Sequence, residues 1–482
     1  MKKKVNIVTG FLAVLMLIIP LSCSEQLDIN SNPLAATKAD PSAILPYVIV
    51  QYSNRKVTEL GTRMVDVYQH SHFTFNSPRN GGGAAGGFLA GNAWGMLYTQ
   101  VLPNLQLVEK DAKAAGVTNN NVAAVAITLK ALAFFDATCL WGEVPFTEAT
   151  NAGNFKFPKF DTQETVLRGV ITLLDEAIAL IDAMPTTGLA SLAVGDLIYG
   201  GNMTNWRAYA NSLKLRTLML IRNKDTSVDA QIVATLAQPL VATNAQAAML
   251  RYPGTVGNQN AWLQIVTAFG TGSNETTNYF APAQPMRDLL TGDPRLALWC
   301  IDGTSGGFAV RGIGQQPSAS FARYSNNLIR ATLPDVWMLP AEITFYRAEL
   351  VVKGVITGDA NVLYRQGVTE ALTFYGQAIP GAVTTLTTGA ITTFVSGLPD
   401  INPLSNSLKL QRIAEQQYLE SLLRPIEAWN TVRRTKFPVM LPSPGSLISG
   451  MLKRLQYSPT ERSANPNTPV DLLGDVPMWF EN

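Results

Sequence analysis

The sequence is poor in charged residues. Only 15% of its 482 residues are charged, against roughly a quarter in soluble domains, and 37 Lys and Arg nearly balance 35 Asp and Glu. Proteins that bind nucleic acid through its phosphates need clustered Lys and Arg in excess, so this balance excludes that class. With 47% hydrophobic residues, the chain also differs from disordered proteins. The composition favours a folded protein whose ligand is close to neutral.

Cysteine and histidine are also scarce. Three Cys are too few for a disulfide framework or a Cys-rich zinc site. Cys139 and Cys300 have apolar neighbours, which favours two buried free thiols, although a disulfide between them stays open. His70 and His72 would need acidic partners from elsewhere to hold a metal ion. We therefore predict no metal site and no cofactor, and the sequence leaves open whether calcium assists binding.

The N-terminus has the pattern of an export signal. Lys2, Lys3 and Lys4 precede an apolar run over 5–21, which is shorter than the ~20 clean residues of a membrane-spanning helix. Cys23 follows a small residue, as in a bacterial lipobox, where the thiol receives a diacylglycerol-type lipid. A plain signal peptide or an uncleaved anchor are the alternatives.

The predicted processing leaves a nearly neutral protein. We predict a lipoprotein signal peptide over 1–22, lipid attachment at Cys23 and a lipid-anchored linker over 23–40. Residues 1–22 contain three Lys and no acidic residue, so their removal changes the formal net charge from +2 to −1. No later segment has 18 consecutive apolar residues, so membrane contact is expected only through the lipid or a partner.

Helical periodicity dominates most of the remaining chain. Apolar residues recur at spacings of three and four, and Pro103 is expected to kink or divide the first helix. Asp161, with Glu164 three residues later, predicts a capping-box start for the third helix. The predicted helices cover 92–115, 121–140, 162–183, 204–222, 340–353, 362–377 and 406–432.

The distribution of Pro and Gly predicts the organisation of the domain. Residues 251–335 alternate Pro, Gly, Asn, Ser and aromatics without a sustained period, so we expect a loop-rich lobe there. A helix-pair scaffold is expected over about 41–250 and 336–435, and a Pro- and Ser-rich C-terminal segment over 436–482. Together these make one domain over 41–482 that is mainly α.

Two loop segments combine aromatic rings with amides. Aromatic faces cover the apolar C–H side of a sugar ring, while amides bond its hydroxyls. The first segment consists of residues 72–77 and Phe88, on either side of the glycine run 81–87. The second consists of residues 258–262 and 278–280, on either side of a Gly-, Ser- and Thr-rich loop. For each ring, packing against the helical body is the competing interpretation. The candidate ligand-binding residues are Phe73, Phe75, Asn76, Phe88, Asn260, Trp262 and Tyr279.

Glu342 and Glu349 lie seven residues apart on one predicted helix. Their rise of about 10.5 Å exceeds the carboxyl separation of a retaining glycosidase. We therefore interpret them as parts of a structural ionic network with Arg216, or with Arg433 and Arg434, rather than as a catalytic pair.

An ordered series of short motifs resembles that of the SusD/RagB family of Bacteroidota, and in particular its SusD-like subgroup. The series includes WGEVPF at 141–146, WRAYANSLKLR at 206–216, GDPRL at 292–296 and RRT at 433–435. The family more usually has Tyr-Gly-Asp where this chain has Trp-Gly-Glu. The resemblance implies tetratricopeptide-like helix pairs that form a right-handed superhelical scaffold with a loop-rich irregular lobe.

The same resemblance implies a location and a function. It implies a non-catalytic lipoprotein that is anchored in the outer membrane and faces outward. Such a protein binds a glycan and delivers it to a SusC-like TonB-dependent transporter. Some relatives take peptides, so a peptide cargo is the first alternative. A surface glycosidase with paired carboxylates and a scaffold without a ligand site are the others.

Overall fold

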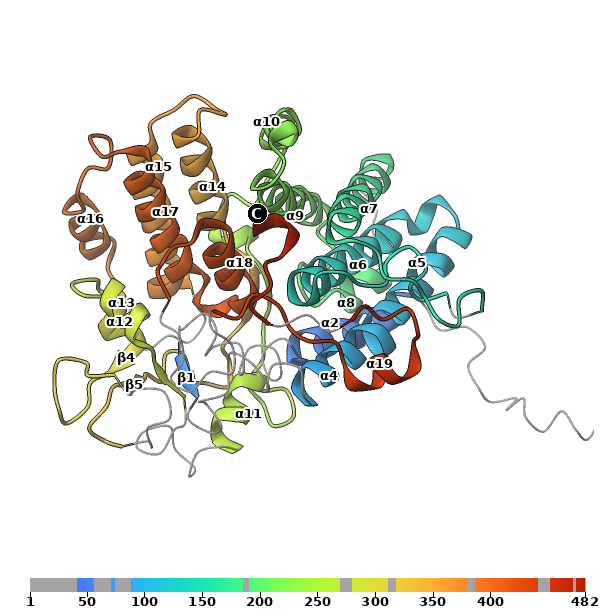
Figure 1. Ribbon diagram of the computed structural model, residues 1–482, viewed down its shortest axis with the longest axis horizontal. Coiled ribbons are helices and arrows are strands. Elements are labelled where there is room, and N and C mark those ends of the chain that lie inside the picture. Colours follow the sequence, from blue (N-terminus) through green and yellow to red (C-terminus); the bar gives the residue numbers. More distant parts are fainter. Residues whose placement is uncertain are drawn as a thin grey trace, which may run out of the picture. The chain divides into compact units, whose positions relative to one another are not determined.

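The structure is a computed structural model in which the described residues all belong to one unit, Pro41–Asn482. It is predominantly helical, as predicted (Figure 1). The described residues are 41–55, 71–73, 88–151, 153–184, 190–268, 280–310, 318–378, 386–440, 451–470 and 474–481. The predicted signal peptide and linker lie outside them.

Most of the helices belong to the two halves of the predicted scaffold. The first half contains α2 (Pro41–Arg55), α4 (Phe88–Gly95), the π-helix η5 (Met96–Val101), α5 (Leu102–Ala114), η6 (Val117–Asn119), α6 (Asn120–Trp141), α7 (Gln163–Ala183), α8 (Ala190–Gly195), α9 (Met203–Arg222), η7 (Thr226–Val228), α10 (Asp229–Leu236) and η8 (Asn244–Gln246). The second half contains α14 (Pro340–Val352), α15 (Ala360–Thr373), the π-helix η9 (Phe374–Ala378), α16 (Thr388–Ser396), α17 (Asn406–Glu420), η10 (Ser421–Leu423) and α18 (Pro425–Thr435).

The lobe, its two borders with the scaffold and the C-terminal segment contain short elements. They are β2 (Ala248–Leu250), α11 (Ala261–Ala268), β3 (Phe280–Pro282), α12 (Gln284–Leu289), α13 (Arg295–Trp299), β4 (Cys300–Ile301), β5 (Arg323–Tyr324), β6 (Asp335–Met338), α19 (Pro459–Ala464) and η11 (Trp479–Glu481). With β1 (Ser71–Phe73), the described strands form three two-stranded antiparallel sheets, β1–β3, β2–β6 and β4–β5.

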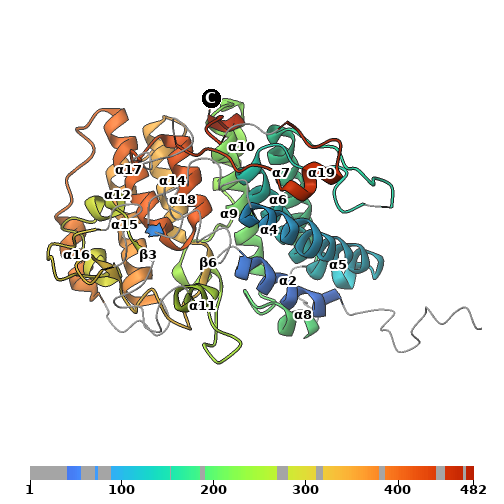
Figure 2. The same cartoon turned by 60° about the horizontal axis from the view of Figure 1, so that its bottom comes forward.

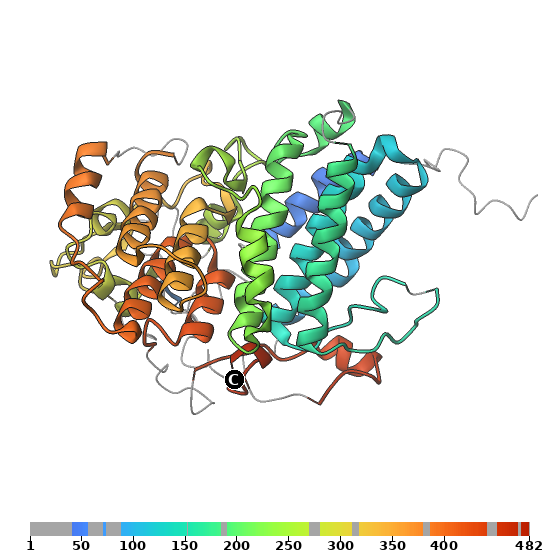
Figure 3. The ribbon, with the colours of Figure 1, turned by 90° about the horizontal axis from the view of Figure 1, so that it is seen from above.

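Helices that follow one another in the chain pack side by side. The contacts run from α5 to α6, from α6 to α7 and from α7 to α9, and Figure 3 shows these helices next to one another. In the second half α14 packs on α15 and α17, and α17 packs on α18. Short connections join α5 to α6, α14 to α15 and α17 to α18, as in helix pairs.

Helix α6 is the centre of the first half. Every residue of α6 after Asn120 is buried, which suits a helix that is apolar on all faces. Its two charged residues are paired: Lys130 with Glu109, and Asp136 with the hydroxyl of Tyr52. Among the described residues, the segment Val117–Trp141 alone is long and apolar enough to cross a membrane. Its apolar 18-residue window is completely buried, which is the pattern of a core helix.

Two helix boundaries differ from the sequence prediction. The N-cap of α7 is Thr162, whose side chain accepts the N–H of Thr165, and not Asp161. Asp161 instead accepts the N–H groups of Phe146 and Thr147, at 3.0 and 2.8 Å. Both oxygens of Asp161 accept hydrogen bonds from Phe146 and Thr147, and the neighbouring hydroxyl of Thr162 caps the helix instead.

The predicted helix over 406–432 is two helices. The turn η10 separates α17 from α18, and Pro425 begins the second helix. Proline disfavours helical geometry in the residue before it, and Arg424 has φ −133° and ψ 71°. The break brings Arg424 back toward Glu420, one turn earlier.

Both cysteines of the described residues are buried and free, as the apolar neighbours indicated. Burial raises the pKa of Cys300 to about 12 and that of Cys139 well above its ordinary value. Neither thiol is therefore set up as a nucleophile.

Candidate functional site

The sheet β1–β3 joins the two segments that sequence analysis selected. Phe73 lies opposite Phe280, and Ser71 lies opposite Pro282, across about 200 residues of chain. Tyr279 directly precedes Phe280 in the sequence, and Phe75 follows Phe73 by two residues. The backbone thus brings the ends of both predicted segments to one place, which we call the β1–β3 platform.

The structure describes only some of the candidate ligand-binding residues. Phe73 ends β1 and Phe88 begins α4. Phe75, Asn76 and Tyr279 lie outside the described residues, so their part in ligand binding stays a prediction.

Asn260 holds the start of α11. Its side chain is 1% exposed, its Nδ2 donates to the carbonyl of Leu333 at 2.7 Å, and its Oδ1 accepts the N–H of Trp262 at 2.7 Å. Its own N–H donates to the carbonyl of Ala331 at 2.8 Å. These bonds fix the position of Trp262, which is half-buried against the core. The amide of Asn260 therefore positions the neighbouring ring, and Trp262 is the better placed of the two to meet a ligand.

A hollow of about 380 Å³ lies elsewhere, where the loop 145–158 meets α4, η5 and α19. Figures 1 and 2 both draw α19 beside α4. The hollow, called the α19 hollow below, is lined by the rings of Trp94, Tyr98, Phe155 and Phe157 together with polar side chains. Sequence analysis did not select Phe155 or Phe157, although the run FKFP at 155–158 in an Asn- and Gly-containing loop was a usable signal.

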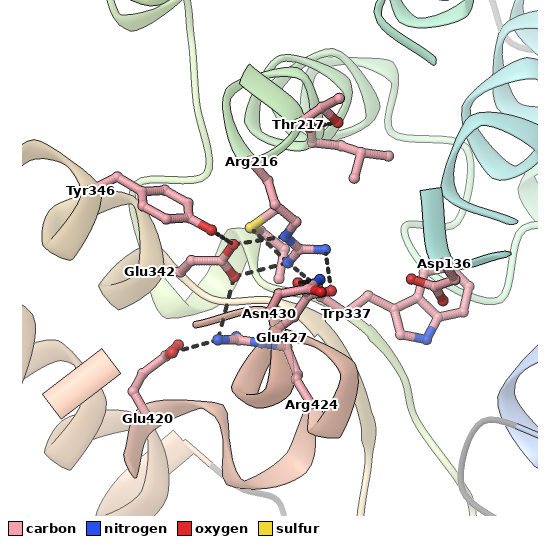
Figure 4. Close-up of polar contacts among 12 residues, drawn as sticks. Asp136, Arg216, Thr217, Trp337, Glu342, Tyr346, Glu420, Arg424, Glu427 and Asn430 are labelled. Atoms are coloured by element: carbon pink, nitrogen blue, oxygen red, sulfur yellow. Dashed lines mark hydrogen bonds and ion pairs between the residues drawn. The ribbon is translucent and has the colours of Figure 1, made fainter. Parts of the chain in front are cut away.

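The carboxylates that could imitate a catalytic pair are bound to arginines (Figure 4). The Nε of Arg216 lies 2.7 Å from Oε1 of Glu342, and the hydroxyl of Tyr346 donates to the same oxygen at 3.0 Å. Glu349 pairs with Arg434 and with Lys353. The predicted structural network is thus confirmed for Arg216 and Arg434.

Arg433 has a different set of contacts. It donates to the carbonyl of Lys453 at 2.6 Å, and its guanidinium lies 3.6 Å from the centroid of the Trp429 ring. It therefore joins α18 to the C-terminal segment rather than to Glu349.

The electrostatics of both glutamates disfavour acid catalysis. Burial raises the pKa of Glu342, but Arg216 and Arg424 outweigh this effect and the pKa lies below its ordinary value. At Glu349, burial also raises the pKa, but Arg434 and Lys353 outweigh this effect and lower the pKa to about 2. A glycosidase acid needs a raised pKa and contact with its substrate, whereas Glu342 and Glu349 are 1% and 3% exposed.

Within the part of the chain that the structure describes, no group of three or more His, Cys, Asp or Glu side chains is arranged so that it could hold a metal ion. The described residues therefore contain no cluster of ligands of the kind that divalent metals prefer.

Comparisons with known proteins agree with the fold. A family model described as "Starch-binding associating with outer membrane", SusD-like, matches residues 40–458. A SusD-like protein from Bacteroidetes has a structure with a TM-score of 0.77 at 20% identity, over 92% of this chain and 100% of that chain. A chitin-binding protein matches with a TM-score of 0.77 at 20% identity, over 92% and 99%.

A third structure, a SusD homolog from Bacteroides fragilis NCTC 9343, has a TM-score of 0.72 at 19% identity, over 92% of this chain and 100% of that chain. No curated protein matches the sequence. At these identities the solved structures establish the shared fold, and the family match covers most of the chain.

Proposed function

The chain belongs to the SusD-like family, and on that premise we propose that it binds a neutral oligosaccharide at the cell surface without cleaving it. The observation that carries the proposal is the family match over residues 40–458, to a family described as starch-binding and outer-membrane associated. The name of the chitin-binding protein of similar fold supports a saccharide ligand. Both descriptions name the binding of a polysaccharide.

The β1–β3 platform is the proposed binding site. In sugar-binding sites, aromatic rings cover the apolar face of the sugar and amides bond its hydroxyls, and we propose these roles for the aromatic and amide residues of the two segments. The predicted processed chain has a formal charge of −1, which suits a cargo without charge. The backbone N–H of Trp262 is held by Asn260, and we propose that Trp262 supplies a further ring to the binding site.

The proposal includes an anchor and a partner. Lipid on Cys23 and the linker over 23–40 would tether the domain to the outer membrane, facing outward. A SusC-like TonB-dependent transporter would receive the saccharide. Incorporation of a palmitate analogue that is lost in Cys23→Ala tests the anchor, and co-purification of a transporter barrel with the detergent-extracted protein tests the partner.

The binding function is tested by screening the full-length protein in detergent against a neutral glycan panel and a peptide panel. We expect binding to at least one glycan class. Binding to peptides with no response to any glycan would replace the saccharide by a peptide cargo and leave the fold unchanged.

The platform is tested by Trp262→Ala in the same protein. Loss of one stacking ring should weaken binding about tenfold, equivalent to about 1.4 kcal/mol. Val256→Ala is the matched control, because Val256 lies in the same segment and is 94% exposed. Equal affinities for the two variants, with unchanged melting temperatures, would remove Trp262 from the site.

A further inference from the structure

We propose that the α19 hollow is a second saccharide-binding site, separate from the β1–β3 platform; this rests on the proposed function. The first observation is the exposure of two rings at its rim. Phe155 and Phe157 are 39% and 43% exposed on the loop 145–158. Two large neighbouring aromatic side chains in solvent are costly for a surface loop, and their exposure is typical of a binding site.

The loop that carries these rings is held at both ends. The bridge between Val144 and Asp161 closes its base, where the carboxylate of Asp161 also accepts two backbone N–H groups from the loop. Farther along, Nδ2 of Asn465 donates to the carbonyl of Pro158 at 2.9 Å, and Nδ2 of Asn467 donates to that of Phe157 at 2.7 Å. These bonds hold the loop backbone, and a loop that is ordered before the ligand arrives loses less conformational entropy on binding.

The inner wall of the hollow is also aromatic. The rings of Trp94 and Tyr98 stack with centroids 4.5 Å apart, and Phe160 lies nearly parallel to Trp94 at 5.8 Å. The polar groups of Trp94 and Tyr98 form hydrogen bonds within the protein. Nε1 of Trp94 donates to Glu461 at 3.3 Å, and the hydroxyl of Tyr98 donates to the carbonyl of Pro145 at 2.9 Å. Trp94 is 4% exposed and packs against Phe160 behind the wall, so the half-buried ring of Tyr98 provides most of the apolar surface of this wall.

The charged groups of the lining favour a neutral ligand. Glu461 also accepts from Nδ2 of Asn465 at 2.9 Å, and Glu148 accepts the N–H of Lys159 at 2.8 Å. The ammonium of Lys156 lies 5.2 Å from the centroid of the Phe157 ring. Two carboxylates repel a phosphate or an anionic lipid headgroup, and the cation beside the rim disfavours a cationic ligand. Exposed Asn151 supplies an amide for hydroxyl groups.

The size of the hollow limits the ligand. About 380 Å³ lies near the lower end of the range for small-molecule pockets. The hollow thus suits a short saccharide or the end of a longer chain. Two such sites on one protein would hold a long glycan at two points and raise its apparent affinity through effective concentration.

The test uses the full-length protein and a short oligosaccharide identified in the glycan panel. Isothermal titration should show two saccharides bound per chain. The double variant Phe155→Ala, Phe157→Ala should remove one of them, or weaken it at least tenfold, and keep the other. Leu107→Ala is the control, because Leu107 is 44% exposed on α5 and lies outside the lining.

The outcomes distinguish a failure of the proposed function from a failure of the second site. If the unmodified protein binds no saccharide, the proposed function is wrong. If it binds one saccharide that Trp262→Ala weakens and the double variant leaves unchanged, only the second site is wrong. Peptide or vesicle binding lost in the double variant, without a change in saccharide binding, would also overturn the second site. Phe157→Tyr keeps an aromatic ring and should retain two sites, which separates loss of the ring from loss of the loop structure.

Discussion

Replacing Glu420 with Gln should remove most of the pH dependence of folding stability between about pH 5 and 8. Glu420 is fully buried at the end of α17, where Arg424 donates to one of its oxygens. The other oxygen, Oε1, has no hydrogen-bond partner among the described residues. Figure 4 shows that Arg424 also faces Glu342, at 3.3 Å, so the two carboxylates share one guanidinium.

Burial is the main reason that the pKa of Glu420 rises, from 4.5 to about 7, against the opposing effect of Arg424. Below about pH 4.5 the carboxyl is protonated in both the folded and the unfolded chain. Between that value and pH 7 the unfolded chain releases the proton while the folded chain keeps it. Stability therefore falls as the pH rises through this window and levels off above it. At 1.36 kcal/mol per pH unit, the loss is roughly 3 kcal/mol.

Two other carboxyls, those of Glu349 and Glu370, also have shifted pKa values. The lowered pKa of Glu349 stabilises the fold above about pH 4.5 and is lost only as the pH falls toward 2. Burial raises the pKa of Glu370, so Glu370 contributes in the same direction as Glu420. We therefore expect Glu420→Gln to keep a residual slope of the same sign.

The assay is equilibrium denaturant unfolding at half-unit steps from pH 5 to 8. The unmodified chain should lose stability with rising pH, and Glu420→Gln should be nearly flat and at least as stable at pH 8. Glu415→Gln is the control, since Glu415 lies on the same helix and pairs with the exposed Arg412. Parallel curves for the unmodified chain and Glu420→Gln would refute the reasoning.

Three further predictions concern the scaffold. Gly169→Ala should lower stability by about 1–3 kcal/mol in denaturant unfolding, because the new Cβ would lie 2.2 Å from Cε1 of Phe146; Gly389→Ala, with open space around it, should be neutral or stabilising. Asp161→Ala should speed tryptic cleavage at Lys156 and Lys159, since it releases two loop N–H groups; Asp175→Ala, which removes an exposed ion pair with Lys214, should not. Cys139 and Cys300 should resist iodoacetamide in the folded protein and react after denaturation, as peptide mass mapping would show; rapid labelling of either folded thiol would contradict their burial.

The sequence predicted the long scaffold helices because their burial follows a local period. In α7 the buried residues Val166, Val170 and Leu174 recur every four positions, and a single face of the helix meets the core. The ionic network was also predictable, since buried Glu342 and Glu349 needed cations from neighbouring helices. Local patterns were enough for both features.

The sequence predicted two helix boundaries wrongly, one because of a distant partner and one because of a proline. Asp161 has the sequence of a cap, but the loop at Phe146 and Thr147 uses its carboxylate. The apolar pattern of α17 continues into α18, so it predicted a single helix. Pro425 instead marks the break, because it begins α18.

The sites depend on long-range contacts that no local pattern contains. The pairing of Phe73 with Phe280 joins segments about 200 residues apart, and the α19 hollow needs residues near 94, 155 and 465 to meet. Residue type identified aromatic and amide candidates, but the tertiary fold decides which of them share a surface.

The most direct test of the central claim is an isothermal titration of the full-length protein with the glycan selected by the panel, followed by mass analysis of the recovered ligand. The account predicts saturable binding of a neutral glycan that is recovered intact. Shortened glycan products, or binding heat from peptides alone, would contradict it.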